Sequence, residues 1–369
     1  MIPPRAGTEH HVNSSQLLIL GVPGPELTSD DAALYRELQP GGFILFTRNI
    51  VDAAQVRRLT DDLRALCTVP PVICIDNEGG RVWRTAPFAP APPSADRFRR
   101  AGDPKLIAQA GFLTGRLLRL LGINLNLAPV LDIDAHPDAQ NALRGRCWGH
   151  RDQEVLTNAG IFNRHQRRQR VLGCAKHFPA GGRAVTDPHH ALPVVDATID
   201  EMQRADLIPY TALMPELDAI MISHLHFPRI DPDQLPASLS SNIINGLLRT
   251  RLGFDHHLVL TDDLDMGAIQ NHYGTPAAAR MSILAGADML LLCHEFARAG
   301  ESLAALDDIP EPIRSDALAR IDRAKARFAT PLPFKDDTLA EIIRGLEQLR
   351  ADTPGEDEDS PAQSPVEDY

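Results

Sequence analysis

The feature that most constrains the fold of this 369-residue chain is a regular alternation of short apolar runs with stretches of helical periodicity. Most of the runs are continuously apolar, as expected for parallel strands that are covered on both faces. Strands are therefore expected at 17–22, 42–47, 71–76, 124–129, 173–177, 219–224, 258–263 and 288–293. Strands alternating with helices in this way are typical of parallel β/α folds.

Helices are expected between the strands. Acidic residues open one helix at Ser29, and apolar residues recur at helical spacing through 52–66. Further helices are expected at 104–121, 153–171, 199–214, 241–252, 276–284, 315–328 and 337–349.

A single (β/α)8 barrel of the TIM type is favoured over a doubly wound sheet. Strand after strand ends in a polar group, and the strand ends of such a barrel converge on one pocket. These polar groups are Asp76, Asp132, Lys176, His177, His224 and Asp262. Residues 16–330 are expected to form this α/β barrel, and 331–350 a C-terminal helix packed on it.

Both ends of the chain are expected to lie outside the barrel. Residues 1–15 are expected to be a flexible N-terminus, and 351–369 a disordered acidic tail. The tail holds seven acidic residues, three prolines and no Lys or Arg, a composition that cannot bury a core. The net charge of −12 argues against nucleic acid as a partner.

Cysteine usage and hydropathy indicate a cytoplasmic protein. The five cysteines are scattered and odd in number, unlike a disulfide framework. The first apolar run, 17–22, is too short for a signal peptide, and no window approaches a membrane span. We therefore expect reduced cysteines and no membrane partner.

The run 173–196 concentrates chemistry after one strand. Its apolar start ends in Lys176 and His177, and glycines and prolines follow, together with Arg183, Asp187, His189 and His190. A loop that carries both glycines and titratable groups is a good candidate for catalysis. A surface loop with incidental histidines is the alternative.

Two other strand ends carry carboxylates. Asp76 precedes Gly79 and Gly80, which let the chain turn so that Arg84 reaches back, and such a pair suits a polyhydroxylated ligand. A buried ion pair that braces the loop is the alternative. Asp262 is the first acid after an apolar strand, and a fixed carboxylate there can serve as nucleophile or stabilise a cationic transition state. Asp263 and Asp265 could cap the next helix.

Metal and cofactor chemistry finds little support. His224 and His226 form an H-x-H pair that, with Asp262, would fit a metal-dependent amidohydrolase. Pro228 ends that strand almost at once, so the two histidines share a face only briefly. The chain has no G-x-G-x-x-G motif or P-loop, and we expect neither metal nor cofactor.

Six sequence blocks occur in order between about residues 17 and 293: GGFILFTRNI at 41–50, IDNEGGRVWR at 75–84, LNLAPVLDID at 125–134, AKHFPAGGRAVTDPHH at 175–190, MISHLHFPRIDP at 221–232 and LTDDLDMGAI at 260–269. Together they resemble glycoside hydrolase family 3, and within it the single-domain bacterial β-N-acetylglucosaminidases of peptidoglycan recycling. The resemblance implies a retaining β-N-acetylhexosaminidase that removes terminal N-acetylglucosamine from muropeptide-like or chitooligosaccharide fragments.

The same resemblance implies roles for individual residues. Asp262 matches the nucleophile, and Asp187 and His189 match a D-x-H dyad in which the histidine is the general acid/base and the aspartate orients it. The positions that match the family's sugar-binding residues are Asp76, Arg84, Arg146, Lys176 and His177. Histidine titrates near neutrality, so it can donate and then remove a proton as a retaining mechanism requires.

The sequence departs from the family pattern in its catalytic loop. It reads Ala180-Gly181-Gly182 where G-H-G is usual, and Pro188 stands where Ser is common. Two alternatives therefore stay open: a family-3 glycosidase or phosphorolytic enzyme of other sugar specificity, and a catalytically weakened sugar-binding protein. A small carbohydrate or muropeptide is the expected partner, and a monomer the expected state.

Overall fold

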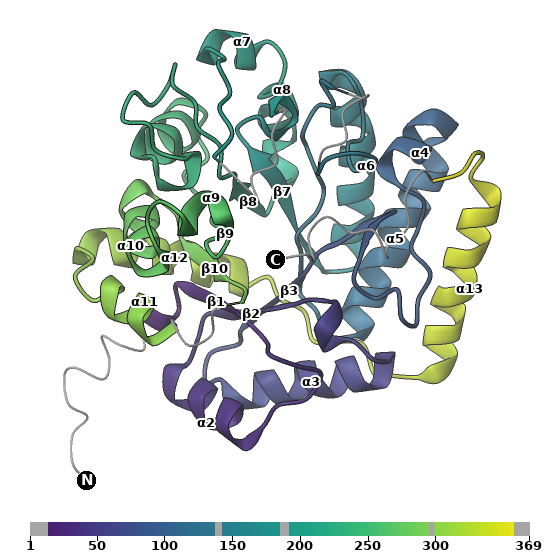
Figure 1. Ribbon diagram of the computed structural model, residues 1–369. Helices are drawn as coiled ribbons and strands as arrows, with labels where there is room; N and C mark the ends of the chain where they lie inside the picture. The colour runs from purple at the N-terminus through teal and green to yellow at the C-terminus, as the bar shows by residue number, and fades with distance from the viewer. Residues whose placement is uncertain (1–13, 137–141, 185–191, 295–298, 358–369) are drawn as a thin grey trace.

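Eight parallel strands form a closed barrel surrounded by helices in the computed structural model, which describes residues 14–136, 142–184, 192–294 and 299–357 (Figure 1). The barrel strands are β1 (Leu18–Gly21), β2 (Gly42–Leu45), β3 (Val72–Ile75), β6 (Leu125–Asn126), β7 (Leu172–Phe178), β8 (Ala219–Ile222), β9 (Leu258–Asp263) and β10 (Met289–Leu292). Consecutive barrel strands pair with one another, and β1 closes the barrel against β10 with Leu18 opposite Leu290. The (β/α)8 barrel expected from the sequence is confirmed.

The strands form because their apolar side chains are covered on both faces. All four residues of β1, β2, β3, β8 and β10 are buried, and the outer faces of these strands pack against the surrounding helices. The N-terminal Ser14 and Ser15 are also buried, so packing begins slightly before the expected boundary at residue 16.

The longer helices follow the expected pattern, and several have clear N-terminal caps. Thr28 and Asp31 form a capping box, and Asp103 caps the helix that begins at Pro104. The helices are α2 (Ser29–Leu38), α3 (Ala53–Leu66), α4 (Ala95–Ala101), α5 (Pro104–Leu120), α6 (Asp152–Arg168), α7 (Ile199–Gln203), α8 (Ile208–Leu213), the π-helix η5 (Asn242–Arg251), α9 (Gly267–Gln270), α10 (Thr275–Ala285), α11 (Ala299–Leu306), α12 (Glu311–Lys325) and α13 (Asp336–Asp352). The helix expected at 199–214 is divided into α7 and α8.

A small hairpin that the sequence analysis did not predict follows β3. Its strands are β4 (Asn77–Gly79) and β5 (Val82–Trp83), joined by a tight turn. Gly79 and Gly80 have φ angles of 108° and 56°, a region that side chains with a Cβ rarely adopt. The hairpin reverses the chain, so that Arg84 lies beside Asp76 at the end of β3.

The C-terminal helix, α13, packs on the outside of the barrel against α5. α13, yellow in Figure 1, runs along α5 and ends near α4. Arg97 of α4 donates hydrogen bonds to the carbonyl groups of Arg350 (2.9 Å) and Thr353 (2.6 Å), and pairs with Asp357 at 3.3 Å. Thr353 and Asp357 of the expected tail are therefore bound to α4, whereas 358–369 lie outside the described residues.

Two chemical expectations can be compared with the structure directly. All five cysteines are free thiols, and four of them are buried. Across the described ranges, no helix combines the length and the apolar character needed to cross a membrane.

Candidate active site

The C-terminal ends of neighbouring strands bring polar side chains to one mouth of the barrel. They are Asp76 after β3, Asp132 after β6, Lys176 and His177 on β7, His224 after β8 and Asp262 on β9. In a parallel barrel these ends share one face, which is where such folds place their active sites. The convergence expected from the sequence is therefore observed.

Lys176 binds two carboxylates at one side of the site. This side, formed by Asp76, Glu78, Arg84, Arg146 and Lys176, is hereafter called the wall. Its Nζ lies 2.6 Å from Oδ1 of Asp76 and 2.6 Å from Oε1 of Glu78. Burial disfavours the ammonium charge, but Asp76 and then Glu78 outweigh burial and raise the pKa of Lys176. Lys176 therefore stays a cation with a fixed position.

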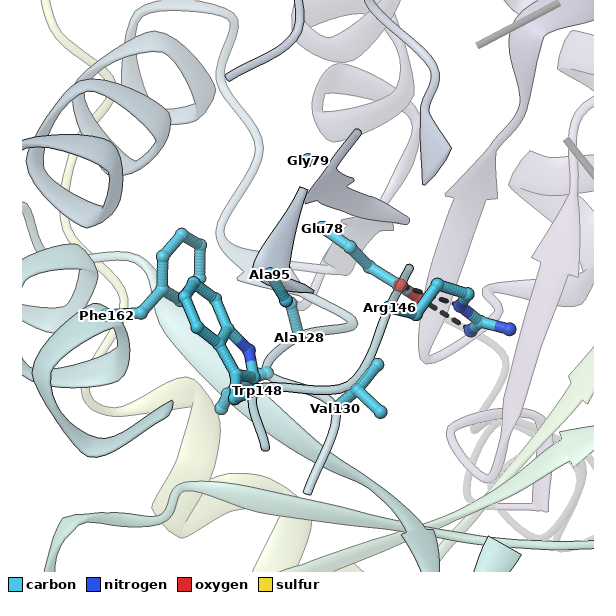
Figure 2. Close-up of a pocket in the computed structure, with 9 residues that line it drawn as sticks. Glu78, Gly79, Ala95, Ala128, Val130, Arg146, Trp148 and Phe162 are labelled. Carbon is cyan, nitrogen blue, oxygen red and sulfur yellow. Dashed lines mark hydrogen bonds and ion pairs between the residues drawn. The ribbon is translucent and has the colours of Figure 1, made fainter. Parts of the chain in front are cut away.

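Arg146 extends the same network. It donates two hydrogen bonds of 2.8 Å to the carboxylate of Glu78, drawn as dashed lines in Figure 2. Burial would raise the pKa of Glu78, but Arg146 and Lys176 outweigh it and hold that pKa well below its usual range. The expected position of Arg146 in the site is thus explained by a partner that the sequence analysis did not single out.

Arg84 lies on the other side of Asp76. One of its terminal nitrogens is 3.9 Å from Oδ2 of Asp76, and its guanidinium carbon lies 5.6 Å from the ring centroid of Phe46. The side chain is almost completely buried, at 1% exposed. The sequence-derived pairing of Asp76 with Arg84 is therefore present, within a larger network that also includes Lys176.

Asp262 is held as a carboxylate at the end of β9. Its Oδ1 accepts a hydrogen bond of 2.9 Å from the backbone N–H of Asp263. Burial opposes ionisation, but the nearby His224 and His177, that N–H group and Lys176 together lower the pKa of Asp262. An anion in this environment is suited to attack an electrophilic carbon or to stabilise developing positive charge.

His177 lies in the same mouth and is oriented by Asp132. Its ring Nδ1 lies 2.7 Å from Oδ2 of Asp132, and its backbone N–H donates to the same oxygen at 3.1 Å. The His177 side chain is 14% exposed, whereas that of Asp132 is fully buried. The imidazole is therefore the accessible member of the pair.

The two acids that follow Asp262 connect β9 to β10. Oδ1 of Asp263 accepts hydrogen bonds from the backbone N–H groups of Asp265 (3.0 Å) and Cys293 (3.2 Å), and Oδ2 of Asp265 accepts one from that of His294 (2.9 Å). The N-cap of the next helix is Met266. The alternative role as helix caps was therefore wrong, because these carboxylates bond to the ends of the two strands.

The histidine pair expected as a possible metal site has a different role. Nε2 of His224 lies 2.8 Å from the carbonyl oxygen of Asp263, and Nδ1 lies 2.7 Å from the Ser238 hydroxyl. A nitrogen bonded to a carbonyl must carry the proton, so Nε2 is not free to bind a metal. Nδ1 of His226 lies 3.2 Å from the carbonyl oxygen of Leu235. These contacts oppose the metal-hydrolase interpretation.

A small cavity lies beside the Glu78–Arg146 pair. Figure 2 shows it between this pair and the aromatic side chains of Trp148 and Phe162. The other lining residues are Gly79, Ala95, Ala128, Pro129 and Val130. The lining is mainly apolar, so the cavity forms part of the packing that supports the wall.

The expected acid/base pair, Asp187 and His189, lies outside the described residues, as does Pro188. Glu78 is a member of the site that the sequence analysis did not single out, whereas Asp132 was expected there as a strand-end group without an individual role. A signal for Glu78 was present, because residues two apart in an extended segment point to the same side, and Asp76 precedes it by two positions.

Comparison with known proteins gives a consistent result. The family model described as the glycosyl hydrolase family 3 N terminal domain matches residues 12–330. A β-hexosaminidase of Thioalkalivibrio sulfidiphilus is 34% identical over 328 residues, which covers 87% of this chain and 92% of that protein.

Two solved structures share the fold over nearly the whole chain. A glycoside hydrolase family 3 β-N-acetylglucosaminidase from Paenibacillus sp. has a TM-score of 0.84 at 33% identity, covering 92% of this chain and 68% of its own. Native NagZ from Neisseria gonorrhoeae has a TM-score of 0.77 at 27% identity, covering 91% of this chain and 96% of its own.

Proposed function

Since this chain belongs to glycosyl hydrolase family 3, we propose that it is a retaining β-N-acetylhexosaminidase. Its substrates would be muropeptide-like or chitooligosaccharide fragments that end in β-linked N-acetylglucosamine. The observation that carries the proposal is the position of Asp262 at the barrel mouth, where, against the effect of burial, His224, His177 and Lys176 lower its pKa. The relatives described as β-hexosaminidase and β-N-acetylglucosaminidase support the choice of sugar.

In the proposed first step, Asp262 attacks the anomeric carbon and the bond to the leaving oxygen breaks. His189 gives a proton to that oxygen, so the leaving group departs as an alcohol. Because Oδ1 of Asp262 is held by the backbone N–H of Asp263, we assign Oδ2 as the attacking oxygen. The product is a covalent glycosyl ester on Asp262.

In the second step, water attacks the same carbon and breaks the ester bond. His189 removes a proton from the water, which restores both residues to their starting states. Asp187 would orient the histidine. The net result is hydrolysis with retention at the anomeric carbon.

The wall around Asp76 would bind the sugar. Carboxylates accept hydrogen bonds from hydroxyl groups, and Lys176, Arg84 and Arg146 donate them. Because Glu78 and Asp76 already fix these cations, little ordering remains to be done when the sugar binds. A further binding residue, His177, lies close enough to Asp262 to lower the pKa of that carboxyl.

We further propose that the protein works as a monomer in the cytoplasm, where recycled cell-wall fragments would be available. Its free thiols are consistent with a reducing compartment.

The test is hydrolysis of an aryl β-N-acetylglucosaminide by the wild type, Asp262→Ala and a control, Asp61→Ala, at neutral pH with a chelator present. Asp61 lies on α3 with its side chain 50% exposed. We expect turnover by the wild type and the control and none by Asp262→Ala. Substantial activity of Asp262→Ala would reject the proposed nucleophile. Faster hydrolysis of gluco or xylo substrates, or a dependence on phosphate, would reject the sugar or the reaction type.

A further inference from the structure

Asp132 is the carboxylate at the barrel mouth that the proposed mechanism does not use. Its side chain is fully buried, and its Oδ2 binds both the imidazole and the backbone N–H of His177, at 2.7 and 3.1 Å. One oxygen therefore fixes the backbone and the ring of the same residue. An arrangement of this kind restricts the rotation of the imidazole.

The segment that carries Asp132 is aligned with β7 by its backbone. Val130 forms a parallel bridge with Lys176, and the N–H of Leu131 donates to the carbonyl of Lys176 at 2.7 Å. Asp132 lies six residues after β6, and these backbone contacts hold its segment beside the end of β7, opposite His177.

Gly181 closes the other side of the carboxylate. A Cβ atom at position 181 would lie 2.6 Å from Oδ1 of Asp132, which is shorter than any normal contact. Asp132 therefore packs directly against the backbone of the Ala180-Gly181-Gly182 segment, where the sequence departs from the family pattern. The glycine allows this close approach, and the approach leaves the carboxylate no room to turn away from His177.

Two other titratable groups near Asp132, the Cys147 thiol and the Tyr210 phenol, stay neutral. Burial first, and the Asp132 charge second, raise the pKa of the Cys147 thiol and of the Tyr210 phenol well above their usual values. Neither group competes with the His177 imidazole, whose Nδ1 lies 2.7 Å from Oδ2 of Asp132.

We propose that Asp132 is a positioning residue for the glycosidase reaction: wedged against Gly181, it holds the His177 imidazole toward the Asp262 carboxylate. Because Asp132 binds Nδ1, the nitrogen presented to the site is Nε2. This inference rests on the proposed role of Asp262. It assigns Asp132 no contact with substrate, and its effect on catalysis passes entirely through His177.

The charged groups that face Asp262 define what this pair contributes. Lys176 and His177 approach from β7, His224 approaches from β8, and Asp263 adds its backbone N–H from β9. Each of the three side chains favours the anionic form of Asp262. Loss of the oriented His177 should therefore make Asp262 harder to ionise, and the acid limb of kcat/KM should move to higher pH.

A double-mutant cycle tests the inference. We expect Asp132→Asn to lower kcat/KM roughly 10- to 100-fold, since small displacements of a catalytic constellation have effects of this size. In a His177→Ala background, the same substitution should change kcat/KM by less than about threefold. If the two losses multiply instead, Asp132 does not act through His177 and the inference fails.

Matched variants separate positioning from general damage. Asp134→Asn alters a nearby acid that pairs with His150 at 3.5 Å, and we expect it to leave both kcat/KM and the acid limb unchanged. If Asp132→Asn does not fold, Gly181→Ala provides the second test, because its methyl group displaces the carboxylate. It should lower kcat/KM in the wild type and have little effect in the His177→Ala background. Equal losses in both backgrounds would overturn the inference.

Rejection of the proposed function would give a different experimental result from rejection of the role of Asp132. In that case Asp262→Ala would match the wild type, whatever the cycle shows. Failure of this inference alone would give an inactive Asp262→Ala together with independent effects of Asp132 and His177.

Discussion

Glu78 and Arg146 are joined by two parallel hydrogen bonds of 2.8 Å between buried side chains. Lys176 also binds Glu78, so one carboxylate fixes two of the cations in the proposed sugar-binding wall. Paired charges of this kind are tolerated inside a protein only because each compensates the other. The wall is consequently rigid before any sugar arrives.

Glu78→Gln should damage both stability and activity. The amide keeps the shape but removes the charge, leaving Arg146 and Lys176 short of a buried counter-ion. We expect a loss of about 3–5 kcal/mol in the free energy of unfolding. We also expect kcat/KM to fall roughly 10- to 100-fold as the two cations move. Urea unfolding and steady-state kinetics measure the two effects.

Glu341→Gln is the matched control, because Glu341 pairs with Arg116 on the surface at 3.0 Å. It should cost less than about 1 kcal/mol and leave kinetics unchanged. Similar losses of stability and activity in the two variants would show that Glu78 contributes no more than a surface ion-pair partner does.

The pH dependence of stability should also report on Glu78. Its folded-state pKa lies well below the unfolded value, so its contribution is present above about pH 4.3 and is lost as the pH falls further. The free energy of unfolding should therefore decline less steeply below pH 4.3 in Glu78→Gln than in the wild type. Parallel curves for the two proteins would contradict this assignment.

The stability of Asp263→Asn relative to the wild type should increase as the pH rises. Burial, followed by the charge of Asp265, raises the folded-state pKa of Asp263 well above its usual value. The wild-type carboxyl therefore loses its contribution to stability as the pH rises from about 4, whereas an amide does not titrate. Thermal unfolding at pH 5 and pH 8 should show the difference in Tm moving in favour of the variant at pH 8.

Gly181→His should lower stability and activity although it restores the residue common in the family. A Cβ at this position would lie 2.6 Å from Oδ1 of Asp132 and would force the carboxylate or the backbone to move. Gly300→Ala, in α11, is the control, because no heavy atom lies within 4 Å of its added Cβ. Thermal unfolding and kcat/KM compare the two, and a more active Gly181→His variant would contradict the packing argument.

His189→Ala should discriminate between leaving groups. Hydrolysis of alkyl or sugar glycosides needs protonation of the leaving oxygen, whereas a dinitrophenyl group departs without it. The first class should therefore lose far more of its kcat than the second. Equal losses on both classes would indicate that His189 only binds the substrate.

The barrel could be predicted because its signal is repeated. Most strands are continuous apolar runs, and strands alternate with helices along the chain, so an error at one boundary does not change the architecture. The hairpin formed by β4 and β5 was missed because its strands have only three and two residues and depend on the φ angles of Gly79 and Gly80. Such short pairs carry no periodicity that a sequence could show.

The site was predicted most directly where a residue ends a strand. Asp76, Lys176, His177 and Asp262 follow apolar runs, and the barrel brings these ends together. The partners that hold them depend on contacts distant in sequence, such as that between Glu78 and Arg146, which are 68 positions apart. Nothing local to Arg146 indicates that a carboxylate of the β4 hairpin would bind it.

The contact between Arg97 and Asp357 forms only after nearly the whole chain has been synthesised. These two residues are 260 positions apart, and the backbone N–H of Ser94 is bonded to the same Asp357 carboxylate at 2.9 Å. Ser94 in turn packs against Gly80, in the turn of the hairpin that positions Glu78 and Arg84. During synthesis on the ribosome, the hairpin therefore emerges long before the segment that clamps it. The wall that would recognise the sugar should be among the last parts of the nascent protein to become fixed.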